Sequence, residues 1–351
     1  MKRLSKGSNM FARLTRWPKW LWKSLFWVSL VVCLIAFGFT IIDKIKMDPI
    51  SSIYQTVIEF FPKDKFCTVP IRIASTISTV LFCFLWLYKD RFYILSVRSF
   101  SHDLGSVDLE TIEKNYSLSS MELDVCDEVK EEEYNKAVLK VDLECESFIR
   151  KSKGAYTGFY GIAHTPLLFR MGYNIGDQTN IKLFHKARSN QSQFKEWVND
   201  GAGFMLDAPQ EINRNVQSNE LIVAISTTFE IKQNELSDLQ PDSKHIIMFK
   251  GKNCGFDVIT SYRDAERARD EITEKVRELV KKYDIIKIHL LISSSAAFTF
   301  FLGMAYSKQH DPECVVYHYQ RPNYPWGISI KATADRCIIQ TKQQEQLSAR
   351  K

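Results

Sequence analysis

The sequence predicts an α/β protein made of two similar units, preceded by two transmembrane α-helices. One observation behind this prediction is a repeated pattern, in which residues 134–172 correspond to residues 265–303 at a constant offset of 131 positions. Each copy reads as an amphipathic helix, a short apolar strand, a turn of small or polar residues and a second helix that ends in Gly. The other observation is a pair of long apolar stretches within residues 1–91. Repetition at a fixed offset indicates a duplicated unit, and alternating strands and helices favour parallel sheets with crossover helices.

The helices and strands of each unit can be placed from their spacing. Apolar residues recur at i, i+3, i+7, i+11 and i+14 from Tyr134 and again from Ala265, which is typical of a helix with one buried face. Short apolar runs predict three strands in each unit, at 92–100, 156–163 and 180–184 and then at 221–229, 285–292 and 314–319. The folded domain is therefore expected at 92–340, with halves at about 92–200 and 218–340 and a polar tail at 341–351.

The N-terminal region, residues 1–91, has the composition of a membrane anchor. Residues 24–42 carry no charge, and as a helix they would extend about 28 Å, close to the thickness of the hydrocarbon core of a bilayer. Residues 69–88 form a second apolar stretch whose only charged side chain is Arg72. A cleaved signal peptide for the first stretch and a buried core helix for the second are the alternatives.

Charge predicts how this anchor is oriented. Residues 1–23 contain seven basic residues and no acid, and Lys89, Arg91 and Arg98 follow the second stretch. The positive-inside rule therefore places both termini and the folded domain in the cytoplasm, as expected at a bacterial inner membrane. The net charge of +6 comes mostly from this region. We interpret it as contact with the lipid bilayer and expect no DNA or RNA polymer as a partner.

The second apolar stretch has a stripe of small or polar residues. Arg72, Ser75, Thr79 and Cys83 are spaced i, i+3, i+7 and i+11, so they share one helical face. Small residues and hydroxyl groups favour close contact between helices in a membrane. The stripe therefore predicts either packing against the first helix or a face for self-association that lines a pore.

The soluble region shows no catalytic motif, and its cysteines and histidines do not have the spacing of a metal site. We expect no catalytic residue, no metal and no cofactor. Two turns are the candidate ligand sites, because each follows a strand and opens a helix: His164-Thr165 and residues 293–295. Backbone N–H groups at a helix start attract anions, although the Ser residues at 293–295 could instead simply cap the helix.

Residues 160–172 resemble the first-half signature of SAVED domains, and residues 288–303 together with 315–319 resemble the second-half signature. SAVED domains consist of two fused CARF-like units with a Rossmann-like fold, and they are the sensors of CBASS antiphage effectors. A SAVED domain behind two N-terminal helices is similar to the CBASS effectors that have two transmembrane helices. The resemblance implies that a partner nucleotidyltransferase makes a cyclic oligonucleotide messenger, with a cyclic trinucleotide favoured. Binding would drive homo-oligomerisation, disruption of the inner membrane and death of the infected cell.

The resemblance also suggests which residues hold the messenger. The candidate hydrogen-bond donors to phosphate are His164, Thr165, Ser293, Ser294, Ser295, Arg188 and Arg321. The candidate stacking surfaces are Phe100, Phe229, Tyr319 and Tyr324, each of which could instead belong to the core. Neither turn carries a Lys, and His164 matches Ser295 in the repeat, so the two half-sites are not equivalent. The alternatives are a membrane-anchored nucleotide-handling enzyme and a structural membrane protein whose soluble domain binds a protein.

Overall fold

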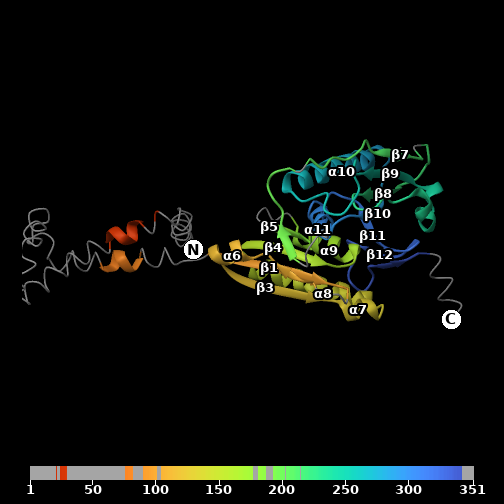
Figure 1. Cartoon of the computed structure of the whole chain (residues 1–351). Coiled ribbons are helices and arrows are strands. Elements are labelled where there is room, and N and C mark those ends of the chain that lie inside the picture. Colours follow the sequence, from red (N-terminus) through yellow and green to blue (C-terminus); the bar gives the residue numbers. More distant parts are fainter. Residues whose placement is uncertain are drawn as a thin grey trace, which may run out of the picture. The chain divides into compact units, whose positions relative to one another are not determined.

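The computed structural model describes residues 21, 24–29, 76–81, 90–100, 104–176, 181–186, 193–201, 203–213 and 215–341. By its internal contacts the chain divides into two units, Met1–Lys89 and Asp90–Lys351. Figure 1 labels most of the helices and strands of the second unit.

The first unit is described over two short helical segments, residues 24–29 and 76–81. The hydroxyl groups of Ser29 and Thr79 lie 2.9 Å apart, so this part of the polar stripe faces the first apolar segment. None of the helices among the described residues is long and apolar enough to cross a membrane. Most of the predicted spans 24–42 and 69–88, with Arg72, Ser75 and Cys83, lie outside the described residues. The two spans therefore stay a prediction.

The second unit contains two sheets with the same central topology. In the first sheet, four parallel strands lie in the order β3-β1-β4-β5: Tyr116–Asp124, Asp90–Arg98, Tyr156–Ile162 and Ile181–Lys186. In the second, the order β9-β8-β10-β11 is equivalent: His245–Lys250, Glu220–Ser226, Lys287–Ser293 and Glu313–Gln320. The predicted duplication is confirmed, and among these eight parallel strands β3 and β9 are the two that the sequence pattern did not predict.

The helices follow the duplication as well. They are α8 and α9 in the first half, Tyr134–Lys151 and Thr165–Ile175, and α10 and α11 in the second, Tyr262–Lys282 and Ala296–Met304. Phe148 and Cys145 of α8 are fully buried, as predicted, but Ile149 is 37% exposed. Ile149 therefore lies at the edge of the buried face, on which Ala137, Val138 and Val141 are also fully buried.

The sequence predicted parallel sheets, but the strands at the edges of the two sheets include antiparallel ones. Antiparallel pairs join β6 to β5, β12 to β11, β13 to β12 and β7 to β9. These strands are Gln193–Glu196, Asn323–Ser329, Ile338–Gln340 and Gln210–Ile212, and the short β2 is Ser106–Val107. The remaining elements are the helices α6 and α7, Glu110–Asn115 and Cys126–Lys130, and the 3₁₀ helices η2 and η3, Gln233–Leu239 and Pro241–Ser243.

Helices α9 and α11 lie between the two sheets and join the halves (Figure 1). A Cβ atom added to Gly172 would come within 2.0 Å of the backbone oxygen of Phe300, and one added to Gly303 within 2.2 Å of that of Phe169. These two contacts are equivalent under the 131-residue offset, so the helices cross about a local two-fold axis. Gly is required at both positions because the backbones touch there.

Apolar clusters cover both faces of each sheet. The largest cluster occupies the inner faces and includes residues of α8, α9, α10 and α11. The outer face of the first sheet buries Phe92 and Phe184, with Leu109 packed beside them, and that of the second sheet buries Ile222 and Tyr317 under Leu236 of η2. Strands buried on both faces read as continuous apolar runs, which is why β1 and β8 could be predicted.

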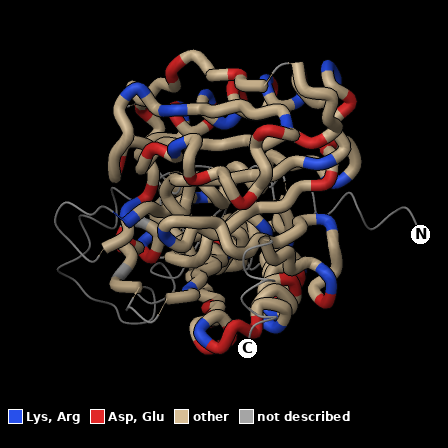
Figure 2. Tube along the Cα trace, turned by 90° about the vertical axis from the view of Figure 1, so that its right-hand side faces the viewer, with Lys and Arg blue, Asp and Glu red and all other residues tan. Residues whose placement is uncertain are grey.

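Charged residues of both signs are interspersed along the described trace of this unit in the view of Figure 2. Examples of paired charges are Lys182 with Glu196 at 2.6 Å and Lys250 with Glu230 at 2.9 Å. Charges mixed in this way partly cancel at a distance, unlike the one-sign surface that attracts a nucleic-acid polymer.

Candidate functional site

The first candidate turn joins β4 to α9. His164 precedes the helix and is 9% exposed. Its backbone N–H donates to the Ser99 hydroxyl at 2.8 Å, and the same hydroxyl lies 2.6 Å from its Nδ1. The Ser99 hydroxyl therefore holds both the backbone and the ring of His164 in place.

Aromatic side chains from both halves surround this turn. The His164 ring stacks on Phe100 with centroids 4.2 Å apart, and it meets His318 of β11 at 4.5 Å. Trp326 of β12 lies 5.1 Å from His318 and stacks on Tyr134 at 4.2 Å. The turn belongs to the first half, whereas His318 and Trp326 belong to the second.

The second candidate turn joins β10 to α11, and its three hydroxyl groups have different roles. Ser295 caps the helix, because its Oγ accepts from the backbone N–H of Phe298 at 3.3 Å. Ser294 Oγ is 2.7 Å from Thr227 Oγ1, which donates to it, and Ser293 Oγ accepts from the backbone N–H of Phe229 at 3.0 Å. A hydroxyl that accepts one bond keeps its own proton, so each of the three serines can still donate to a ligand.

An enclosed hollow adjoins the Ser295 end of this turn, and it too is built from both halves. His185 and Lys186 come from the end of β5, and Thr227, Thr228 and Ser295 come from the second half, with Gly255, Asp257, Val258 and Ile259 from the loop after β9. Lys186 supplies the positive charge that neither turn has in the sequence. Its ammonium group donates to the backbone oxygen of Leu104 at 2.7 Å.

Exposed aromatic rings lie beyond β8. Phe229 is 61% exposed and Phe256 is 40% exposed, and their centroids are 5.0 Å apart at an interplanar angle of 88°. Large apolar rings at the surface are unusual in a domain with a well-filled core, and they offer faces on which a base can stack.

A family model matches residues 144–330, more than half of the chain, and its description is "SMODS-associated and fused to various effectors sensor domain", abbreviated SAVED. The chain belongs to the SAVED family. Both segments from which the sequence predicted this family, 160–172 and 288–303, lie inside the match. No curated protein matches the chain.

Solved structures of SAVED proteins are among those to which this chain is similar. An Acinetobacter baumannii Cap4 receptor in complex with the cyclic trinucleotide 3'3'3'-cAAA has a TM-score of 0.48 and 16% identity, with 81% of this chain and 63% of that chain covered. The Cap4 receptor of Moraxella osloensis has a TM-score of 0.40 and 16% identity, over 75% and 57% of the two chains. This chain therefore spans less than two thirds of the length of these structures.

Several predicted ligand residues of the SAVED domain lie apart from the two turns. Tyr319 and Tyr324 contact each other at 5.1 Å, and the Tyr319 hydroxyl donates to Glu235 of η2 at 2.9 Å. Tyr319 thus faces the outer side of β11, opposite to His318, because side chains alternate along a strand. Tyr324 is 3% exposed and belongs to the core, so it offers no stacking surface. Arg321 is exposed between β11 and β12, and Arg188 lies outside the described residues.

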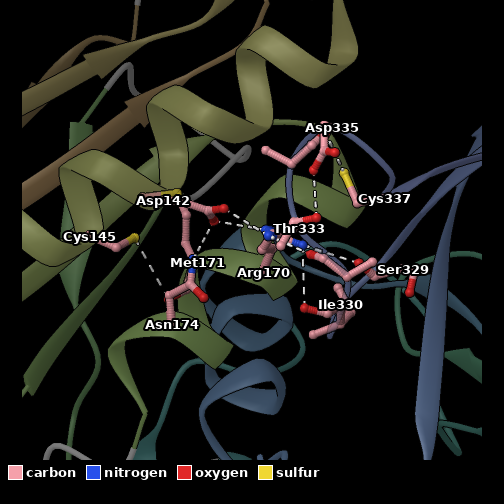
Figure 3. A network of polar contacts seen from close by, with 12 residues as sticks. Asp142, Cys145, Arg170, Met171, Asn174, Ser329, Ile330, Thr333, Asp335 and Cys337 are labelled. Carbon is pink, nitrogen blue, oxygen red and sulfur yellow. Dashed lines mark hydrogen bonds and ion pairs between the residues drawn. The ribbon is translucent and has the colours of Figure 1, made fainter.

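A polar network behind the first turn ties the halves of the SAVED domain together (Figure 3). Arg170 of α9 is 4% exposed and forms a two-pronged ion pair with Asp142 of α8, at 2.8 and 2.7 Å. Its remaining N–H groups donate to the backbone oxygens of Ser329, Ile330 and Ala332, at 3.1, 3.3 and 3.0 Å. All five guanidinium protons are used, so α9 is fixed to α8 and to the segment after β12.

The histidines of the first turn predict a dependence of stability on pH. Burial lowers the pKa of His164 to about 3, with a smaller contribution from His318, and burial lowers the pKa of His318 to about 4. The unfolded chain takes up these protons near pH 6.5, so the folded state loses stability as the pH falls from 6.5 toward 4. For His164 the free energy of unfolding at pH 5 is about 2 kcal/mol lower than at a pH well above 6.5.

Urea unfolding of the full-length protein in detergent at pH 6.5 and pH 5 measures this loss. His164→Gln should remove about 1.5 kcal/mol of the difference between the two pH values, because at pH 6.5 the unfolded imidazole is already half protonated. His310→Gln, at an exposed position, serves as the control and should leave it unchanged. An unaltered difference in His164→Gln would show that this imidazole is protonated equally in the two states.

Proposed function

We propose that this protein is a membrane-embedded effector of a bacterial CBASS antiphage system, and that its SAVED domain binds a cyclic oligonucleotide messenger, most favourably a cyclic trinucleotide. The observation that carries the proposal is that side chains of the opposite half lie at each turn. His318 contacts His164 at the first turn, and His185 lines the hollow next to Ser295 at the second. A ring of linked nucleotides suits such a site, since one ligand can contact both halves at once. Membership of a sensor family supports the same assignment.

The available contacts are strong enough for tight binding. Each hydrogen bond to a charged phosphate contributes about 1.5–3 kcal/mol, and each stacked base about 1–3 kcal/mol. Association costs about 4–15 kcal/mol. A few contacts of each kind, from the serine hydroxyls and from Phe100 and Phe229, therefore suffice for nanomolar affinity. The domain acts on the messenger by binding alone, so the ligand should be recovered intact.

The N-terminal region would turn binding into damage to the membrane. In this proposal both termini and the SAVED domain face the cytoplasm, where a partner nucleotidyltransferase makes the messenger. Two helices cannot enclose a pore, so the effect requires several copies, which the messenger assembles because it binds the assembled state more tightly. Arg72, Ser75, Thr79 and Cys83 share one helical face and are the residues proposed to meet neighbouring copies, and the Thr79 hydroxyl also lies 2.9 Å from that of Ser29.

The test uses full-length protein in liposomes that contain a fluorescent dye, with cyclic tri-adenylate as the messenger. We expect dye release and a larger oligomer only when the messenger is present. Ser294→Tyr fills the second turn and should abolish both effects, whereas Ser243→Tyr, exposed at the opposite edge of the second sheet, should retain them. Release without messenger, or full activity in Ser294→Tyr, would contradict the proposal.

A further inference from the structure

The edge of the first sheet at which β1 begins lies opposite to the turn at His164. Asp90, the first residue of β1, pairs with Tyr116 of β3, and β4 begins beside the same end of β1 at Tyr156. The helix α8 also ends at this edge, because residues 152–155 alone join it to β4. The turn at His164 follows the other end of β4, about 25 Å away along the strand.

The charges that the end of α8 and the residues after it bring to this edge are all positive. Arg150, Lys151 and Lys153 are exposed, and none of the three forms an ion pair with another described residue. Residues 147–176 contain no acid. Charges of both signs lie on the neighbouring elements, at Asp90, Arg91, Glu110, Glu113 and Lys114. The edge therefore keeps a net positive charge.

Apolar surface lies among these cations. Tyr156 is 38% exposed, and Ile149 in the last turn of α8 is 37% exposed. The ring of Tyr156 contacts that of Tyr116, with centroids 4.9 Å apart at an interplanar angle of 62°. Tyrosine rings are typical of the interface between membrane and water, and Lys and Arg beside them attract anionic headgroups. A soluble anion would satisfy the cations and leave the apolar side chains in water, whereas a lipid surface covers both.

The length of the connecting chain brings a membrane within reach in the proposed topology. Lys89 is the only residue between the second apolar stretch, 69–88, and the start of β1 at Asp90. One residue of extended chain spans about 3.5 Å. The edge at which β1 begins therefore has to stay close to the point at which that stretch leaves the bilayer.

We propose that a surface of five residues, which we call the α8–β4 rim, binds the anionic headgroups of the cytoplasmic leaflet. Its residues are Ile149, Arg150, Lys151, Lys153 and Tyr156. This inference rests on the proposed function, which supplies the membrane and the orientation. Each Lys or Arg near an anionic surface strengthens binding about fivefold, so three cations give about 100-fold. A domain bound in this way turns the edge with His164 away from the lipid, where the messenger can enter.

Acylation of lysine side chains by a neutral reagent tests the inference on full-length protein, reconstituted into lipid nanodiscs without messenger. Mass spectrometry compares the rate at each lysine between phosphatidylcholine alone and an equal mixture with phosphatidylserine. Phosphatidylserine should slow the acylation of Lys151 and Lys153 about 100-fold, and this protection should disappear in about 1 M salt, which screens charges within about 3 Å. Lys252, exposed in the loop after β9, should react equally in both bilayers.

Two charge reversals separate the rim from the rest of the domain. Arg150→Glu leaves both reporter lysines in place and lowers the charge of the rim from three to one, so the protection should fall to about fivefold. Lys130→Glu, exposed in α7 at the opposite end of the sheet, is the matched control and should keep the wild-type protection.

Equal rates at Lys151 and Lys153 in the two bilayers, or full protection in Arg150→Glu, overturns this inference and leaves the proposed function standing. Protection that persists in neutral bilayers and in detergent would assign the rim to a contact between copies of the chain, and it would overturn the inference as well. Failure of the protein to remain in the nanodiscs overturns both.

Discussion

Gly303→Ala is expected to lower the free energy of unfolding by about 3 kcal/mol or more, and Gly172→Ala by a similar amount. The new methyl group would lie 2.2 Å from the backbone oxygen of Phe169 in the first case and 2.0 Å from that of Phe300 in the second. Backbone atoms of a packed helix cannot move aside as the end of a side chain can. The two halves must therefore separate at the crossing, and the apolar core between them loses contacts. Urea unfolding of the full-length protein in detergent measures the loss.

Two further variants sharpen this experiment. Gly255→Ala is the control, since its nearest neighbour would be a side-chain carbon of Val258 at 3.5 Å, an ordinary contact. The double variant Gly172→Ala/Gly303→Ala should lose clearly less than the sum of the single losses, because one separation of the helices accommodates both methyl groups. Additive losses, or single losses no larger than that of Gly255→Ala, would refute the close crossing.

Arg170→Met should cost about 3–5 kcal/mol, the usual effect of removing one partner of a buried ion pair. The change removes the ion-pair partner of Asp142, which keeps only the Asn174 amide at 2.6 Å, and takes this donor away from the backbone oxygens of Ser329, Ile330 and Ala332 (Figure 3). Arg170→Lys should recover only part of the loss, because an ammonium group cannot match the two-pronged geometry. Thermal and urea unfolding of the full-length variants give the values.

The comparison for Arg170 is the ion pair between Lys136 and Glu133, whose side chains are 67% and 37% exposed. Lys136→Met should change stability by less than about 1 kcal/mol, since water screens such pairs. Arg170→Met/Asp142→Leu should be more stable than Arg170→Met alone, because it removes the unpaired carboxylate. A loss in Arg170→Met no larger than that in Lys136→Met would mean that the network does not hold the halves together.

The duplicated core could be predicted from the sequence because its strands are buried on both faces and its helices have one apolar side. The strand β3 escaped prediction because it lies at the edge of its sheet, and its alternating sequence buries only Met121 and Leu123. The strand β9 is a short apolar run, and its role becomes evident only once the two sheets are compared. The resemblance to the family was found in the segments around α9 and α11, which pack against each other between the two sheets.

The candidate site was only partly predictable. The turns at His164 and at residues 293–295 follow from the position of strand ends, which periodicity reveals. Other residues near the turns come from strands and loops far away in the sequence, namely His318, His185 and Asp257. No local sequence pattern indicates that they lie there. The signal that could have identified His318 and His185 was the two-fold relation itself, since it brings the end of the last parallel strand of one half to the helix start of the other.

The crossing of α9 and α11 also determines which relative motions of the halves are available. Backbone contact at Gly172 and Gly303 prevents the halves from moving closer, and sliding along either helix would drive a carbonyl oxygen into the next side chain. Rotation about the point of contact is the one motion that the crossing itself does not block, although the bonds of Arg170 and the shared apolar core oppose it. Because each turn combines a helix of one half with a strand of the other, such a rotation changes the width of both turns at once.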